Sequence, residues 1–198
     1  RAFHADPHYI RKVEEERTDE ILPCIACHHC TNLLEINVPV GCAVNPQSTY
    51  EKDRRIRPVG RPRKVMVVGG GPAGMQVARM LARQGNQVGL FEATDELGGQ
   101  MRYSARVAPD YGYLTTYLAG QMKRRKVDVH LNTKVDLNLT TDFDPDAVVV
   151  ATGARAGLNF WPVKGQPTTF DLFSSMDRPD DDWEERVVIA GADSESCF

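Results

Sequence analysis

The sequence has few of the features that mark membrane, secreted or nucleic-acid-binding proteins. No apolar run approaches the ~20 residues that a membrane-spanning helix needs. Residues 1–20 are too rich in charge for a secretory signal peptide. The formal net charge of −3 gives no electrostatic reason to expect nucleic acid or an anionic membrane as a partner. Hydrophobic residues make up 41% and charged residues 26%, which is the balance of an ordinary globular protein.

Cysteines are also scarce, and four of the five lie close together. Cys24, Cys27, Cys30 and Cys42 share one short stretch, whereas Cys197 lies far away. A disulfide scaffold would spread its cysteines through a short secreted chain. The clustering instead favours metal ligation in a reducing compartment, so we expect a cytoplasmic protein.

The spacing of the four cysteines favours an iron–sulfur cluster. Cys24-x2-Cys27-x2-Cys30 places three thiolates on one tight loop, and eleven residues separate Cys30 from Cys42. A cubane cluster has four irons, each of which takes one thiolate, so three close ligands and one distant ligand suit a [4Fe–4S] cluster. Structural zinc more often uses two separated C-x2-C pairs and is the alternative.

After a basic connector, strand and helix patterns alternate along the chain. Strands are predicted at 65–68, 87–92, 127–131 and 147–151, and amphipathic helices at 72–84 and 112–126. This alternation predicts an α/β fold with a doubly wound parallel sheet, a Rossmann-like dinucleotide-binding domain. A small irregular cysteine segment precedes it, and residues 9–20 are expected to form a helix.

The turn after the first predicted strand has the pattern G-x-G-x-x-G at Gly69, Gly71 and Gly74. Gly69 permits a tight turn, Gly71 lets a pyrophosphate approach the backbone, and Gly74 lets helix and strand pack closely. Pro72 and Ala73 open the helix, whose N-terminal N–H groups attract phosphate. The turn therefore predicts a dinucleotide site.

An acidic residue and several strand ends extend this predicted site. Glu92 follows Gly69 by 23 residues, and its carboxylate can accept hydrogen bonds from ribose hydroxyls. A carboxylate there disfavours a 2′-phosphate, so the expected ligand is FAD, or ADP, and not NADP. Further contacts are predicted from residues that follow the next three strands: Gly99, Gln100, Val135, Thr152 and Gly153.

Together these motifs resemble the C-terminal part of the iron–sulfur NADH:flavin oxidoreductases of the old yellow enzyme class, which include 2,4-dienoyl-CoA reductase and trimethylamine dehydrogenase. The resemblance rests on the runs CIAC at 24–27, CAVNP at 42–46, GGGPAG at 69–74 and ATGA at 151–154. It implies an upstream barrel that carries FMN and handles substrate, with Arg1 as a candidate FMN phosphate ligand. It also implies a cluster that passes electrons between FMN and the second nucleotide domain.

The resemblance implies four parts: residues 1–20 as the end of a missing barrel, 21–60 as the cluster segment and linker, 61–176 as the FAD or ADP domain, and 177–198 as the start of a truncated second nucleotide domain. In the turn that begins at Gly191, Asp193 and Ser196 stand where glycines are expected. We therefore expect that NAD(P)H does not bind there in the usual pose, and that an electron-transfer flavoprotein is the redox partner. The alternative is a surface turn whose acidic side chains point to solvent, with NAD(P)H as the redox partner.

Some positions depart from the family pattern, and two other readings stay open. Met75-Gln76 replaces the commoner Leu-Glu, and His28 stands where many relatives have Asn. One alternative is a non-catalytic module that holds structural zinc and ADP. Another is the small subunit of a glutamate-synthase-like enzyme, but that group carries two cysteine clusters and only one set of four is seen here.

Overall fold

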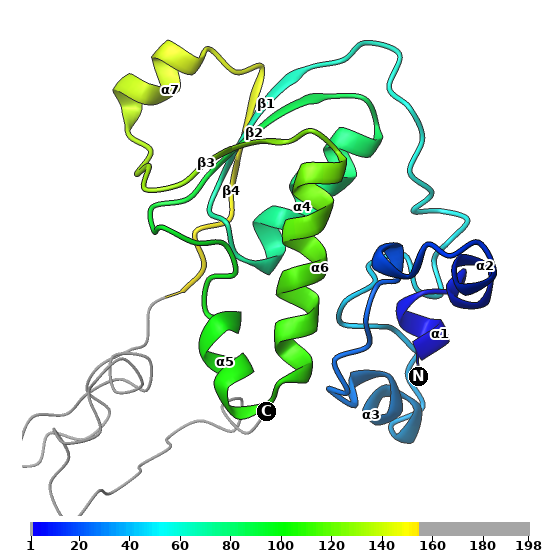
Figure 1. Ribbon diagram of the computed structural model, residues 1–198. Coiled ribbons are helices and arrows are strands. Elements are labelled where there is room, and N and C mark those ends of the chain that lie inside the picture. The colour runs from blue at the N-terminus through cyan, green and yellow to red at the C-terminus, as the bar shows by residue number, and fades with distance from the viewer. Residues whose placement is uncertain (1, 155–198) are drawn as a thin grey trace, which may run out of the picture. The chain divides into compact units, whose positions relative to one another are not determined.

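The computed structural model describes residues 2–154, in which an irregular segment with short helices precedes an α/β unit (Figure 1). The irregular segment contains α1 (Ala2–Ala5), α2 (Tyr9–Glu14), the 3₁₀ turn η1 (Thr18–Glu20) and α3 (His29–Glu35). The α/β unit contains β1 (Lys64–Val68), α4 (Pro72–Arg83), β2 (Gln87–Phe91), α5 (Met101–Val107), α6 (Asp110–Arg124), β3 (Asp128–His130), α7 (Leu137–Phe143) and β4 (Ala147–Val150).

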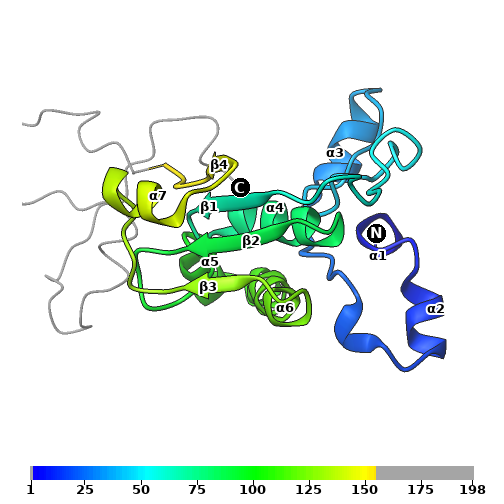
Figure 2. The same ribbon diagram turned by 90° about the horizontal axis from the view of Figure 1, so that it is seen from above.

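The four strands form one parallel sheet in the order β3-β2-β1-β4, so that the first strand is central. Val67 of β1 is in register with Leu90 on one side and Val149 on the other. Figure 2 shows β1, β2 and β3 side by side and running in the same direction. This is the strand order of a dinucleotide-binding half-domain, and it confirms the predicted fold class.

Helices cover both faces of the sheet because side chains alternate along each strand. Val65 and Val67 of β1 point into the core that α4 and α6 complete. Met66 points the other way, where the Thr140 hydroxyl of α7 donates to its Sδ atom at 3.9 Å. On that second face the ring of Phe143 meets Phe91 edge-on, with ring centroids 5.2 Å apart.

Helices α4 and α6 have the apolar spacing that the sequence predicts. Leu114, Leu118 and Met122 are buried on one face of α6, at the three- to four-residue spacing of an amphipathic helix. Met75 and Ala78 are the corresponding fully buried residues of α4. The two helices pack on each other beside β1 and β2, which holds the glycine turn against the rest of the domain.

The predicted helix over residues 9–20 is wrong in its second half. Helix α2 ends at Glu14, Glu16 adopts a left-handed conformation with φ 54°, and only the 3₁₀ turn η1 follows. The Arg17 N–H closes this helix end by donating to the Lys12 carbonyl at 2.8 Å. The charged residues at 9–20 favour a longer helix, but a C-terminal turn with a left-handed residue ends the helix at Glu14.

The irregular segment shares its hydrophobic core with the α/β unit. Ala5, Leu22, Ile25 and Val44 are buried in one cluster with residues of β1, α4 and α6. The cysteine segment is therefore not a separate unit joined only by a linker. Within residues 2–154 no helix is both long and apolar enough to cross a membrane. The predicted boundary between residues 176 and 177 lies outside the described residues.

Candidate functional site

Two glycines of the turn between β1 and α4 are required by the packing of the protein itself. Gly69 has a φ of +110°, and a Cβ atom there would lie 2.3 Å from the Ala151 carbonyl oxygen. A Cβ atom on Gly74 would lie 1.9 Å from the Gly69 carbonyl oxygen. Both positions exclude any side chain. Because these residues are glycines, the first turn of α4 can lie close to the end of β1.

Gly71 has no such internal reason to be glycine. It is the N-cap of α4 with φ −71° and ψ 177°, a backbone conformation open to any residue, and its Cβ atom would approach no protein atom closer than 4.0 Å. The free space therefore lies directly in front of a helix N-terminus, where the N–H groups of residues such as Ala73 lack intrahelical partners. Pro72 at the first position gives up no hydrogen bond. A pyrophosphate fits this space.

The Glu92 carboxylate reaches the same turn from the end of β2. It accepts hydrogen bonds from the Gly70 N–H at 2.6 Å, the Thr94 N–H at 2.9 Å and the Thr94 hydroxyl at 3.0 Å. Burial raises the pKa of Glu92, but these hydrogen bonds outweigh burial and hold the pKa below its ordinary value. The group is thus ionised at neutral pH, beside the glycine turn, as a ribose acceptor must be. Sequence reasoning did not identify the roles of Gly70 and Thr94.

The loop before α5 folds back onto the glycine turn. The Gly98 N–H donates to the Gly70 carbonyl at 2.9 Å, and a Cβ atom on Gly99 would lie 3.1 Å from Gly71 Cα. Gln100 follows as the N-cap of α5. Arg102 fixes the loop, because its Nε donates to the Gly99 carbonyl at 3.2 Å while its guanidinium also pairs with Glu96. Arg102 and Glu96 carried no motif by which the sequence could identify them.

The remaining predicted contacts lie at the ends of β4 and β3. The Ala151 N–H donates to the Val68 carbonyl at 2.8 Å, which brings Thr152 and Gly153 beside Gly69, and Gly153 has a φ of +74°. After β3, the Thr133 N–H donates to the Glu92 carbonyl at 2.8 Å, and the partly buried Val135 follows two residues later. Loops that follow all four strands thus gather along the carboxyl edge of the sheet, where ligands bind in such folds.

Three of the four predicted cysteine ligands contact the shared hydrophobic core, but the described side chains do not meet at one point. Cys24, Cys27 and Cys42 pack against the shared hydrophobic core, and each is partly exposed. Burial raises the pKa of the Cys42 thiol, hydrogen bonds of Val44 and Asn45 lower it, and the nearby Cys24 and Cys27 raise it. Cys30 lies in the first turn of α3. Among residues 2–154 no three His, Cys, Asp or Glu side chains converge to hold one metal ion.

The backbone of the cysteine loop turns twice through the left-handed region. Ala26 has a φ of 53° and His28 a φ of 58°, on either side of Cys27. Alternating backbone conformations of this kind turn N–H groups into a concavity that suits anions, and such concavities occur at iron–sulfur sites. His28 is also the N-cap residue of α3, and its carbonyl accepts from the Thr31 hydroxyl at 2.7 Å. No sequence motif signals this local geometry, because Ala26 and His28 are not residues that favour the left-handed region as glycine does.

A buried carboxylate fixes the chain just before the cysteine loop. Asp6 is only 3% exposed and accepts from Lys12 Nζ at 2.5 Å, from the Leu22 N–H at 2.9 Å and from the His8 N–H at 3.0 Å. Lys12 Nζ also donates to the Glu20 carbonyl at 2.8 Å. The pair therefore holds the helical segment and the start of the cysteine loop in one arrangement.

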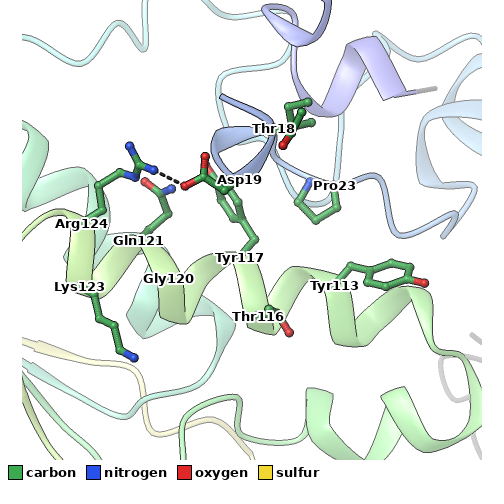
Figure 3. Close-up of a pocket in the computed structure, with 11 residues that line it drawn as sticks. Thr18, Asp19, Pro23, Tyr113, Thr116, Tyr117, Gly120, Gln121, Lys123 and Arg124 are labelled. Atoms are coloured by element: carbon green, nitrogen blue, oxygen red, sulfur yellow. Dashed lines mark hydrogen bonds and ion pairs between the residues drawn. The ribbon is translucent and has the colours of Figure 1, made fainter. Parts of the chain in front are cut away.

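Helix α6 contacts η1, the 3₁₀ turn that precedes the cysteine loop. Arg124 pairs with Glu20 at 2.8 Å. It also pairs with Asp19, as Figure 3 shows. An open cavity of about 760 Å³ lies between η1 and α6. Figure 3 shows Tyr117 projecting from α6 toward η1, with Pro23, the neighbour of Cys24, at the wall of the cavity.

Comparison with protein families identifies the dinucleotide-binding unit. Residues 36–144, more than half of the chain, match the pyridine nucleotide-disulphide oxidoreductase family. The chain is 38% identical to an N,N-dimethylglycine/sarcosine dehydrogenase of Chromohalobacter salexigens, over 90% of this chain and 28% of that protein. It is 34% identical to a bilirubin reductase of Mediterraneibacter gnavus, over 96% of this chain and 30% of that protein.

Solved structures give the same result. A 2-naphthoyl-CoA reductase superposes with a TM-score of 0.78 at 32% identity, over 81% of this chain and 25% of that chain. A histamine dehydrogenase of Rhizobium sp. 4-9 superposes with a TM-score of 0.73 at 29% identity, over 78% of this chain and 24% of that chain. The chain spans less than a third of the length of these relatives. It therefore belongs to the pyridine nucleotide-disulphide oxidoreductase family and corresponds to the C-terminal FAD-binding part of flavin and iron–sulfur oxidoreductases of the trimethylamine dehydrogenase and 2,4-dienoyl-CoA reductase type.

Proposed function

We propose that this chain is the electron-relay part of a flavin-dependent oxidoreductase. Cys24, Cys27, Cys30 and Cys42 would hold a [4Fe–4S] cluster, which supplies single-electron transfer. The glycine turn from Gly69 to Gly74 would hold FAD, or ADP, with its pyrophosphate at the N-terminus of α4. Electrons would pass between this unit and the FMN of an upstream barrel in the same protein.

The observation that carries this proposal is the joint packing of the two predicted sites. Three of the four cysteines pack against the core that contains Met75 and Ala78 of α4, and the N-terminus of α4 opens onto the free space at Gly71. Both predicted sites therefore border one hydrophobic core, which supports a fixed separation between them. A fixed separation is what a relay of electrons between two bound groups requires.

The substrate and the electron partner belong to the rest of the protein. The relatives include a dehydrogenase and a reductase by name, so the family supports electron flow in either direction. The residues that would handle substrate lie in the proposed FMN barrel. We further propose an electron-transfer flavoprotein as the redox partner, because the turn at Gly191 carries Asp193 where a phosphate-binding glycine is expected.

Metal and flavin analysis of the full-length protein, purified without oxygen, tests this function. We expect about four irons and four acid-labile sulfides for each chain, as the cluster formula requires. Cys27→Ser should lose the cluster, whereas Cys197→Ser, a cysteine outside the proposed set, should keep it. Stoichiometric zinc without sulfide in the unaltered protein would refute the cluster, and absence of a bound adenine nucleotide would refute the second site.

A further inference from the structure

Arg79 is a buried positive charge whose two side-chain hydrogen-bond partners are neutral. It lies on α4, is 7% exposed, and donates to the Tyr117 hydroxyl at 2.9 Å and to Gln76 Oε1 at 3.0 Å. Burial and the charge of the Asp6 carboxylate raise the pKa of Tyr117 above its ordinary value, although Arg79 lowers it, so the phenol stays protonated. The Asp6 carboxylate is itself paired with Lys12. Within residues 2–154 no carboxylate lies within ion-pair distance of Arg79.

Further positive charges and an unpaired donor around Arg79 favour a negatively charged group nearby. Burial lowers the pKa of Arg83, one helical turn further along α4, and the positive charges of Arg79 and Arg125 lower it further. Gln76 Nε2 is buried and has no acceptor. A buried guanidinium is ordinarily paired, because an uncompensated charge in a protein interior is costly. The site thus presents an unbalanced charge and an unused donor.

Two anionic groups belong to the proposed function, and the position of Arg79 separates them. Arg79 lies eight residues after Gly71, which is about 12 Å along a helix, so it is remote from the proposed pyrophosphate. Its partner Tyr117 lines the cavity between η1 and α6 together with Pro23, the neighbour of Cys24. The cysteine site is therefore the better match for the unbalanced charge.

We propose that Arg79 is the fixed counter-charge of the iron–sulfur cluster and favours its reduced form. This inference rests on the proposed cluster. Four thiolates leave a cubane cluster anionic, and each electron that it accepts adds a negative charge, so a buried cation stabilises the reduced state more than the oxidised state. Gln76 and Tyr117 hold the guanidinium in place and remain neutral themselves. Arg79 thus supplies a fixed positive charge near the proposed cluster and takes no part in a chemical step.

The test is an anaerobic redox titration of the full-length protein with dithionite, in which the reduced cluster is followed by electron paramagnetic resonance. Arg79→Met removes the charge and retains most of the side-chain length. At a fixed potential we expect the ratio of reduced to oxidised cluster to fall about tenfold, a midpoint shift of about 59 mV for one electron. Arg79→Lys should keep most of the original ratio. An unshifted midpoint in a fully loaded Arg79→Met protein overturns the inference.

Further variants separate charge from structure. Arg11→Met removes an exposed charge from α2, which precedes the cysteine segment, and the midpoint should not change because solvent screens that charge. Gln76→Glu adds a carboxylate beside Arg79 and should lower the midpoint as Arg79→Met does. If the Arg79→Met protein does not fold or does not keep its cluster, the Gln76→Glu protein provides the test. An unshifted cluster midpoint in the Gln76→Glu protein then overturns the inference. An unaltered protein without iron or sulfide refutes the proposed function itself.

Discussion

Gly71 and Gly74 lie three residues apart in one turn, but each is glycine for a different reason. A Cβ atom on Gly74 would collide with the backbone of Gly69, whereas one on Gly71 would enter free space. The protein needs Gly74 in order to fold. The free space at Gly71 is explained by a group that the chain itself does not supply, and a bound nucleotide is such a group.

These two glycines therefore predict opposite effects of substitution. Gly71→Val should lose the bound adenine nucleotide, because the side chain would occupy the place of the pyrophosphate. Its thermal stability should be close to that of the unaltered protein freed of nucleotide, since a bound ligand itself stabilises the fold. Gly74→Val should destabilise the domain by about 1–3 kcal/mol or more, as overpacking does. Thermal unfolding and nucleotide analysis of the two purified variants provide the measurement. A Gly71→Val protein that keeps its full nucleotide content would contradict the site.

Glu92 predicts a pH dependence of stability in acid. Its pKa in the folded protein lies below the ordinary value, so the ionised carboxylate stabilises the fold above the unfolded pKa. That contribution is lost as the pH falls through the ordinary glutamate value, about 4.3, toward the lower folded value. Urea unfolding at a series of pH values should show the loss, and Glu92→Gln should remove this part of the slope. An identical slope in both proteins would show that the carboxylate does not contribute.

The helical segment before the cysteines depends on one buried ion pair. The side chains of Asp6 and Lys12 are 4% and 16% exposed, and the Asp6 carboxylate holds the Leu22 N–H. Because of these contacts the chain turns back after α2 and reaches Cys24 in a fixed position. The charged composition of residues 9–20 favours a longer helix, but the tertiary contacts of Lys12 favour the turn.

Loss of only one partner of this pair should be more damaging than loss of both. Lys12→Met leaves a buried carboxylate without a counter-charge, which typically costs about 3–5 kcal/mol. The double variant Lys12→Met with Asp6→Leu has no unpaired buried carboxylate and should recover part of the lost free energy of unfolding. Chemical unfolding of both single variants and the double variant gives the coupling energy. Strictly additive effects would show that the pair is not coupled in solution.

At the scale of the whole molecule, we expect the second nucleotide turn predicted at Gly191 to decide how electrons enter or leave. Its residues, 191–196, lie outside those that the structure describes. Asp193 would bring a carboxylate close to the phosphates of a bound dinucleotide, where like charges in a partly buried crevice repel by several kcal/mol. The full-length protein should therefore keep its flavin oxidised when mixed anaerobically with micromolar NADH or NADPH.

Absorbance in a stopped-flow instrument measures this outcome directly. Dithionite, which needs no nucleotide site, should reduce the same flavin and serves as the positive control. Rapid bleaching by NADH or NADPH would contradict the prediction and would assign a nicotinamide nucleotide as the redox partner. Asp193→Gly restores the glycine, so it is the matched variant in which bleaching by a nicotinamide nucleotide should rise.

The sequence by itself determined the order and type of the main elements, because their signals are local. Apolar spacing along residues 72–84 and 112–126 predicts α4 and α6 to within two residues, and the glycine turn predicts where β1 ends. It also predicted Glu92 and the strand-end residues, since parallel strands bring their carboxyl ends to one edge. Helices α5 and α7 were missed because both are short and weakly patterned. In α7 the Asp136 cap, which accepts from the Leu139 N–H at 2.8 Å, was the available signal.

Only the tertiary structure decided how the cysteine segment relates to the dinucleotide domain. The sequence places Cys24 and Ala78 more than fifty residues apart and gives no rule for contact between them, because burial is a non-local property. In the fold they share one hydrophobic core, and Asp6, Lys12 and Arg79 acquire their roles from it. Local chemistry thus predicts what each motif can bind. Long-range packing fixed the charges and distances around it, since these depend on chain segments that meet only after folding.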